Sequence, residues 1–274
     1  MLLAFQLSLP AVLIAFATGV QHRFGERVGG LVAGLPLTTL PIVALVALAH
    51  GDRFAARASS ADLAGVVAQA VMLWVLARSL RRHRPPTALA LSLGVFAAAV
   101  AALDVLPALP AFLAAGAATA ALGAVAHCWP PAGAPGGPAP RRERRRERRR
   151  GGDLGLRMAL GAAFTLALVE TSGGLGAHLS GLVSALPVLS TTMAVLTAGS
   201  DGGPAAAELL RGVTAGSFAT VAALVVLSLV LPEGHLVAAL CAAAGAALLT
   251  QAVIETAGAS RAAPSLRRVR AGLG

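Results

Sequence analysis

The chain has 274 residues, of which 57% are hydrophobic and only 12% are charged, and its mean hydropathy is +0.78. Soluble domains carry about 25% charged residues, so this composition excludes an ordinary soluble globular protein. Apolar runs of about 20 residues recur along the chain, and this pattern predicts an all-α, polytopic transmembrane helix bundle.

The formal net charge of +10 is concentrated in one place. All 22 basic residues are Arg, and eight of them lie between Arg141 and Arg150. Like charges at this density repel and stay solvated, which predicts a flexible cytoplasmic tether that fixes the topology. The alternative is contact with anionic lipid headgroups, so we expect membrane lipids as partners there and no nucleic acid. Cys128 and Cys241 are too few for a disulfide framework or a metal centre. We therefore predict no cofactor and no metal.

Apolar windows bounded by charge, Pro or Gly predict about nine spans of the length that a bilayer core requires. They cover residues 2–20, 29–49, 62–80, 87–106, 108–128, 154–172, 179–199, 212–231 and 236–256. The first window has no basic residue before it, unlike a cleaved signal peptide, so it is predicted to be a retained helix. Pro107 and Pro110 should separate the fourth span from the fifth, because proline removes helix hydrogen bonds that lipid cannot replace.

Nine spans with the basic segment in the cytoplasm place 20 of the 22 arginines inside and leave Arg53 and Arg57 outside, as the positive-inside rule requires. The N-terminus is then outside, and the linker and C-terminus are cytoplasmic, in a bacterial-type inner membrane. The predicted organisation is a first transmembrane repeat at 1–129, a basic linker at 130–152, a second transmembrane repeat at 153–258 and a basic tail at 259–274.

A constant offset of 151 residues relates the two halves. Residues 30–36, GLVAGLP, match residues 181–187, GLVSALP, at five of seven positions. The same offset pairs Leu45 with Leu196, Gly51 with Gly202 and Gly65 with Gly216. Five spans precede the linker, so the two copies should cross the membrane in opposite directions. This predicts two inverted-topology repeats of five plus four spans, an architecture on which many secondary transporters work.

This arrangement resembles the drug/metabolite transporter superfamily, whose members are small multipass carriers built from two inverted five-helix halves. The likeness is architectural and covers residues 1–130 and 153–257, with four spans instead of five in the second half. It implies a carrier whose two halves exchange conformations to open a central site to either side of the membrane.

Hydroxyl side chains gather at the predicted midpoints of the two repeated spans. The candidate substrate-binding residues are Thr38, Thr39, Ser190, Thr191 and Thr192. Each group follows a repeated proline, Pro36 or Pro187, and Pro41 should add a second helix break to the first copy. Helices broken at mid-depth expose backbone polar groups to a ligand. The alternative is that these hydroxyls bond back to their own helix and repair the proline kinks.

Other polar residues lie in or near the predicted spans. Gln69, whose counterpart is Thr220, is either a supporting ligand contact or a hydrogen bond between helices. Glu170 is expected near the outer headgroups, about 25 Å of helix rise from Asp153; if it faced a cavity it would be a possible proton or cation coupling group. Asp62 is expected at the outer helix ends, where charged groups meet water, as are Asp104 and His178.

Motifs for nucleotide phosphates, catalytic zinc or a serine nucleophile elbow are absent from the sequence, so we do not expect an enzyme. The chain is expected to be a secondary transporter or permease for a small uncharged or amphipathic solute. The alternative is a non-transporting membrane scaffold, whose small-residue faces, such as Gly212 and Gly216, pack against helices of a partner.

Overall fold

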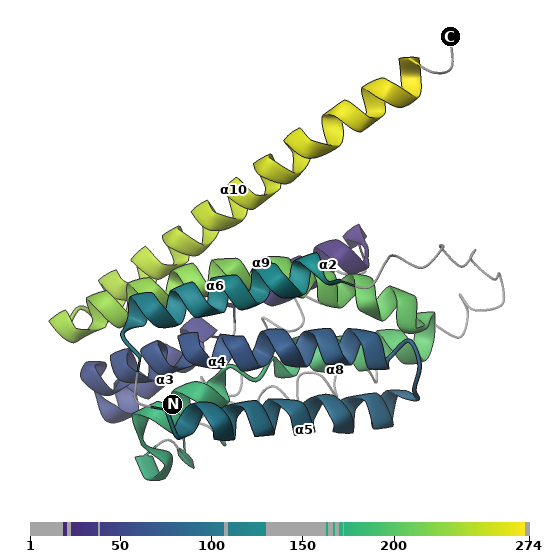
Figure 1. The fold of residues 1–274 in the computed structure, drawn as a ribbon. Helices are drawn as coiled ribbons and strands as arrows, with labels where there is room; N and C mark the ends of the chain where they lie inside the picture. Colours follow the sequence, from purple (N-terminus) through teal and green to yellow (C-terminus); the bar gives the residue numbers. More distant parts are fainter. Residues whose placement is uncertain are drawn as a thin grey trace.

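A computed structural model describes residues 19–20, 23–37, 39–106, 109–129, 163, 167, 170–171 and 173–271, with side chains up to Thr256. This part of the chain is helical and holds no strand, which confirms the all-α prediction (Figure 1). Its elements are α2 (Glu26–Gly34), α3 (Thr39–His50), α4 (Asp52–Ser79), α5 (Pro85–Asp104), α6 (Ala111–His127), the helix Gly173–Ser184, α8 (Val188–Asp201), α9 (Gly203–Val230), the short 3-10 helix η1 (Leu231–Glu233) and α10 (Leu236–Ala271).

Five helical segments in this part of the chain are long and apolar enough to cross a membrane, or six if the bent pair Gly173–Ser184 and Val188–Asp201 forms one span. Helix α6 is apolar but has only 17 residues. The expected spans at 2–20 and 154–172 lie almost entirely outside the described residues. The apolar helices are those of a membrane-embedded protein, and large side chains such as Phe112, Val237 and Leu249 are exposed on the outer helices, where lipid would cover them.

Two helices begin earlier than expected. Helix α4 starts at Asp52 instead of residue 62, and α9 starts at Gly203 instead of residue 212. Gly51 and Gly202 separate these helices from the preceding ones, and their φ angles of 90° and 94° favour glycine. Charged residues near the start of each helix do not end it, because a long side chain can lay its stem along the helix and keep its charged end exposed.

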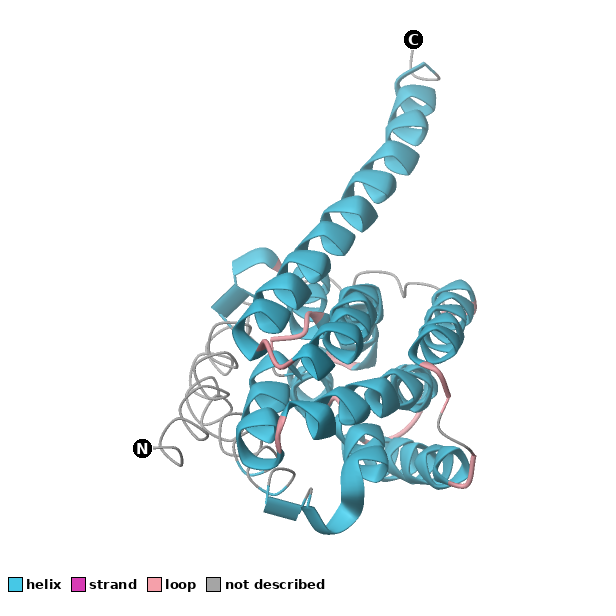
Figure 2. Cartoon of the chain, turned by 90° about the vertical axis from the view of Figure 1, so that its left-hand side faces the viewer, coloured by secondary structure: helices cyan, strands magenta, loops and turns pink. Residues whose placement is uncertain are grey.

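Helix α10 continues to Ala271 and projects beyond the bundle (Figures 1 and 2). The basic tail predicted at 259–274 begins within this helix, whose backbone is helical as far as Ala271. The linker at 130–152 lies outside the described residues.

The offset of 151 residues also relates helix bounds. Helices α4 and α9 both have 28 residues, and their first and last residues differ by 151. Helices α5 and α10 begin at Pro85 and Leu236, which are again 151 apart.

The long helices α4 and α9 form the centre of the bundle and pack against each other in opposite directions. Gly203 at the start of α9 lies against Leu80 at the end of α4, with 2.9 Å between a Cβ built on Gly203 and the Leu80 carbonyl carbon. Further along, Gln69 of α4 contacts Ser217 of α9. Residue numbers along α4 therefore fall as those along the adjacent α9 rise, so the two helices are antiparallel.

Two helices end at the repeated prolines: α2 before Pro36 and the helix Gly173–Ser184 before Pro187. Glycines let these two broken helices approach the central helices closely. Helix α2 lies on α9, where Gly30 faces the Leu209 carbonyl and Gly34 faces Gly216. The helix Gly173–Ser184 lies on α4, where Gly181 faces the Ala58 carbonyl. Gly212 also contacts α2, through the Arg27 carbonyl. The small-residue face that the scaffold alternative assigned to a partner is therefore occupied by a helix of the same chain.

Candidate functional site

The two helix breaks have matching backbone hydrogen bonds. After α2, the Leu35 N–H donates to the Val32 carbonyl over 3.2 Å, and in the second half the Leu186 N–H donates to the Val183 carbonyl over 3.0 Å. One turn later, each repeated proline carbonyl accepts a bond: Pro36 from Leu40 and Pro187 from Thr191, over 3.1 and 2.8 Å. Each donor and acceptor at the first break is 151 residues before the matching donor or acceptor at the second break. The two breaks therefore share one local geometry.

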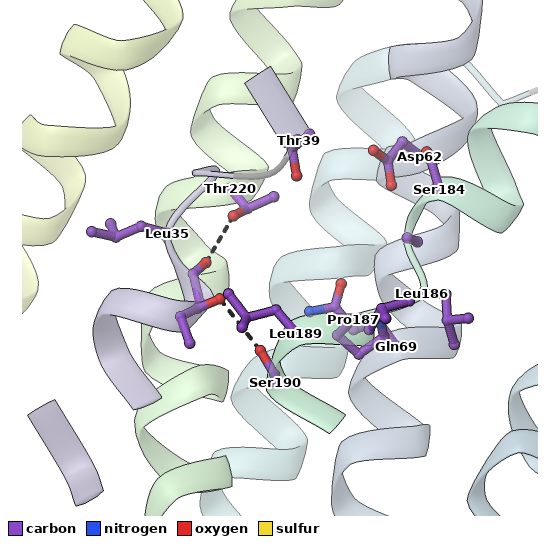
Figure 3. Close-up of a pocket in the computed structure, with 14 residues that line it drawn as sticks. Leu35, Thr39, Asp62, Gln69, Ser184, Leu186, Pro187, Leu189, Ser190 and Thr220 are labelled. Atoms are coloured by element: carbon purple, nitrogen blue, oxygen red, sulfur yellow. Dashed lines mark hydrogen bonds between the residues drawn. The ribbon is translucent and has the colours of Figure 1, made fainter. Parts of the chain in front are cut away.

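Side chains of the second half bond to carbonyls at the first break. The Ser190 hydroxyl donates to the Ala33 carbonyl over 3.3 Å, and the Thr220 hydroxyl donates to the Gly34 carbonyl over 2.9 Å (Figure 3). Because a broken helix leaves backbone carbonyls without their intrahelical donors, these two hydroxyls stabilise the break and tie it to α8 and α9.

A cavity of about 40 Å³, called here the central cavity, lies between the two breaks. Residues of both breaks line it, at 33–35 and 184–190. Its polar side chains are Thr39, Asp62, Gln69, Ser184, Ser190 and Thr220 (Figure 3). This volume accommodates only a few water-sized groups.

Most of the polar lining follows the repeat. Thr39 is 151 residues from Ser190, and Gln69 is 151 residues from Thr220. Asp62 and Ser184 break this correspondence, because their counterparts are Val213 and Ala33. The central cavity therefore has two symmetric pairs of hydroxyl and amide groups, with one carboxyl group added from the first half and one hydroxyl group added from the second.

The position of Asp62 corrects the sequence prediction. It was expected at a helix end in water, but it is 3% exposed and lies ten residues inside α4, which is about 15 Å of rise from Asp52. Its side chain hydrogen-bonds to Ser184. The prediction was wrong because the span was started after Arg53 and Arg57, whereas α4 includes both arginines.

Three further candidates have specific partners or places. The Gln69 amide donates to the Ser217 hydroxyl over 3.1 Å, so it links α4 to α9 while it also lines the central cavity. The Thr192 hydroxyl donates to the Val188 carbonyl of its own helix over 2.8 Å. Thr191 is buried, and its hydroxyl has no hydrogen-bond partner among the described residues. Neither threonine lines the central cavity, and Thr38 lies outside the described residues.

Pro41 does not break a helix, and Glu170 does not meet the condition that a coupling role would require. Helix α3 runs from Thr39 to His50 without a break, because Pro41 lies in its first turn, where a backbone N–H has no intrahelical acceptor. The Glu170 side chain is exposed and is not part of the central cavity lining.

Neither a protein-family model nor a curated protein nor a solved structure matches the chain. Within the described residues, no group of three or more His, Cys, Asp or Glu side chains lies close enough to hold a metal ion. The functional argument therefore depends on the central cavity and on the contacts that enclose it.

Proposed function

We propose that the protein is a secondary transporter whose two halves are inverted repeats and alternate between inward-open and outward-open states. The observation that carries this proposal is the polar central cavity between the two proline-broken helices. Carriers of this design bind their solute near the bilayer midplane, where broken helices offer backbone groups that continuous helices keep bonded.

The glycine contacts support the opposite directions of the two broken helices. Along α2 and α9 the residue numbers rise together, since Gly30 faces Leu209 and Gly34 faces Val213. They also rise together where Gly181 faces Ala58 and Ala185 faces Gly65. Each broken helix is thus parallel to the central helix on which it packs. Because the central helices are antiparallel, the broken helices are antiparallel as well.

The proposed topology has nine spans in a bacterial-type inner membrane, with the N-terminus outside and the linker and C-terminus in the cytoplasm. The distribution of arginine supports this orientation, since it leaves only Arg53 and Arg57 outside. The arginines from Arg141 to Arg150 would contact anionic lipid headgroups at the inner surface.

The lining of the central cavity supports a small uncharged or amphipathic solute. Hydroxyl and amide groups donate and accept hydrogen bonds without requiring a charged ligand, and they come from both halves, at Thr39, Gln69, Ser190 and Thr220. A solute that bonds to both halves would be released when the halves move apart on one side.

Loss of cavity hydroxyls is expected to weaken solute binding. A metabolite library would first be screened for compounds that stabilise the purified protein against heat. Uptake of each stabilising compound into proteoliposomes would then be compared for the wild type, Thr39→Val and Ser190→Ala. One lost hydrogen bond should raise the apparent KM about tenfold, from a loss of about 1.4 kcal/mol.

The matched controls are Thr214→Val and Ser228→Ala, whose hydroxyls bond only to carbonyls of their own helix, at Leu210 and Val225. These variants should transport as the wild type does. Unchanged uptake of every stabilising compound by both cavity variants would contradict the proposed site.

A further inference from the structure

A second cavity, of about 20 Å³, adjoins the central cavity at Asp62. Asp62 and Ser184 line both cavities. The second cavity extends from Asp62 toward the first turns of α4, where Ala55, Ala58 and Ser59 line it. The carboxyl group of Asp62 therefore stands at the boundary between two internal spaces, one on the central side and one toward the Gly51 end of α4.

Asp62 is the single titratable side chain in the lining of either cavity. Across the second cavity it meets the apolar side chains Ile42, Val43 and Val46 of α3. Other titratable residues lie on the elements packed around Asp62, but none of them lines either of these two cavities. Along each element, the one nearest to the cavities in sequence is Arg57 of α4, His50 of α3, His178 of the helix Gly173–Ser184, Arg27 of α2, Asp201 of α8 and Arg211 of α9. A carboxylate in such surroundings requires a bound proton or cation to neutralise it.

The hydroxyl groups beside Asp62 suit a proton better than a metal cation. The Ser184 hydroxyl donates to the Gly181 carbonyl over 2.7 Å, and the Ser59 hydroxyl donates to the Ala55 carbonyl over 2.9 Å. With its own proton directed at Gly181, the Ser184 oxygen can accept a bond from a protonated Asp62, and after rotation it can donate to the carboxylate. A dehydrated cation would instead need several oxygen ligands directed at one point.

We infer that Asp62 binds and releases the proton that couples solute movement to a proton gradient. The inference rests on the proposed transport function and adds the coupling ion to it. Asp62 takes one proton from water that reaches one cavity and releases it to water that reaches the other, and the Ser184 hydroxyl stabilises both forms. Because Val213 occupies the equivalent position in α9, each cycle moves one proton through this group.

Infrared difference spectroscopy on the reconstituted protein tests this inference with the proton itself as the probe. Titration from about pH 4 to about pH 10 covers the range of perturbed carboxyl groups. We expect the wild type to show a protonated-carboxyl band that disappears as the pH rises. Asp62→Asn should lack this band, and Asp62→Glu should retain a band that titrates.

Two further variants make the assignment specific. Asp104→Asn removes an exposed carboxyl group at the end of α5 and should leave the band unchanged. Ser184→Ala removes the hydrogen-bond partner and should shift the frequency of the band. A band that is absent, constant across the titration, or removed by sodium ions at constant pH would overturn the inference.

The spectroscopic result does not depend on an identified solute, so it separates this inference from the transport proposal. If the band titrates but the protein transports no tested solute, proton binding at Asp62 is supported and its coupling to transport is contradicted. Solute uptake that is unaffected by a pH gradient and by Asp62→Asn would contradict coupling while it supports transport.

Discussion

Replacement of Gly216 by alanine is expected to destabilise the folded chain by about 3 kcal/mol, toward the upper end of the usual effect of overpacking. A Cβ at Gly216 would overlap the Leu31 carbonyl oxygen and lie 2.9 Å from the Gly34 Cα. Both neighbours are backbone, so no side-chain rotation relieves the overlap. Helix α2 would have to move away from α9, and the hydrogen bond from Thr220 to the first break would be lost with it.

Thermal unfolding in detergent, followed by far-ultraviolet circular dichroism, measures this effect. The matched controls are Gly123→Ala in α6 and Gly245→Ala in α10, where an added Cβ meets nothing within 4 Å. These controls should be neutral or stabilising by up to about 1 kcal/mol, because alanine favours the helix. A Gly216→Ala variant as stable as the controls would show that α2 and α9 are not in close contact.

Covalent connection of the two breaks is expected to abolish transport. The Ser190 hydroxyl lies 3.3 Å from the Ala33 carbonyl, so cysteines at these two positions are within reach of a short thiol cross-linker. Since the proposed cycle separates the halves on one side of the central cavity, an Ala33→Cys, Ser190→Cys variant should lose uptake when cross-linked by a bis-methanethiosulfonate, which forms disulfide bonds, and recover it when these are reduced. The exposed native cysteines, Cys128 and Cys241, would first be replaced by serine.

A cross-link within one half provides the control for this experiment. The His50 and Phe54 rings are 4.9 Å apart on either side of Gly51, so a His50→Cys, Phe54→Cys pair joins α3 to α4 in the first half alone. This double-cysteine variant should still take up solute after cross-linking. Transport that continues with the two breaks linked would mean that the halves do not separate during the cycle.

The coarse fold could be predicted from the sequence, because hydropathy and proline placement act locally. Apolar runs predicted the helices, and the repeated Gly-Leu-Val segments predicted both breaks at Pro36 and Pro187. Thr39, Ser190 and Gln69 were predicted as site residues and do line the central cavity. The position of a residue along its predicted helix and the offset between the repeats are sufficient to predict these three site residues.

The rest depends on which helices meet, which spacing in the sequence does not specify. Asp62 was missed because its burial comes from the helix Gly173–Ser184, more than 100 residues away along the chain. Thr220 was noted only as the counterpart of Gln69, and its bond to Gly34 became evident only in the packed fold. The valine at the equivalent position of the other repeat, Val213, was the signal in the sequence that could have identified Asp62.

Cysteine labelling of two equivalent positions tests most directly whether the halves are inverted. Arg53 and Pro204 are 151 residues apart, and both are exposed near the start of a central helix. In a background without native cysteines, a membrane-impermeant maleimide applied to right-side-out vesicles should label the Arg53→Cys variant. It should label the Pro204→Cys variant only after the membrane is permeabilised. Labelling of both variants from the same side would contradict the inverted arrangement and the transport mechanism that depends on it.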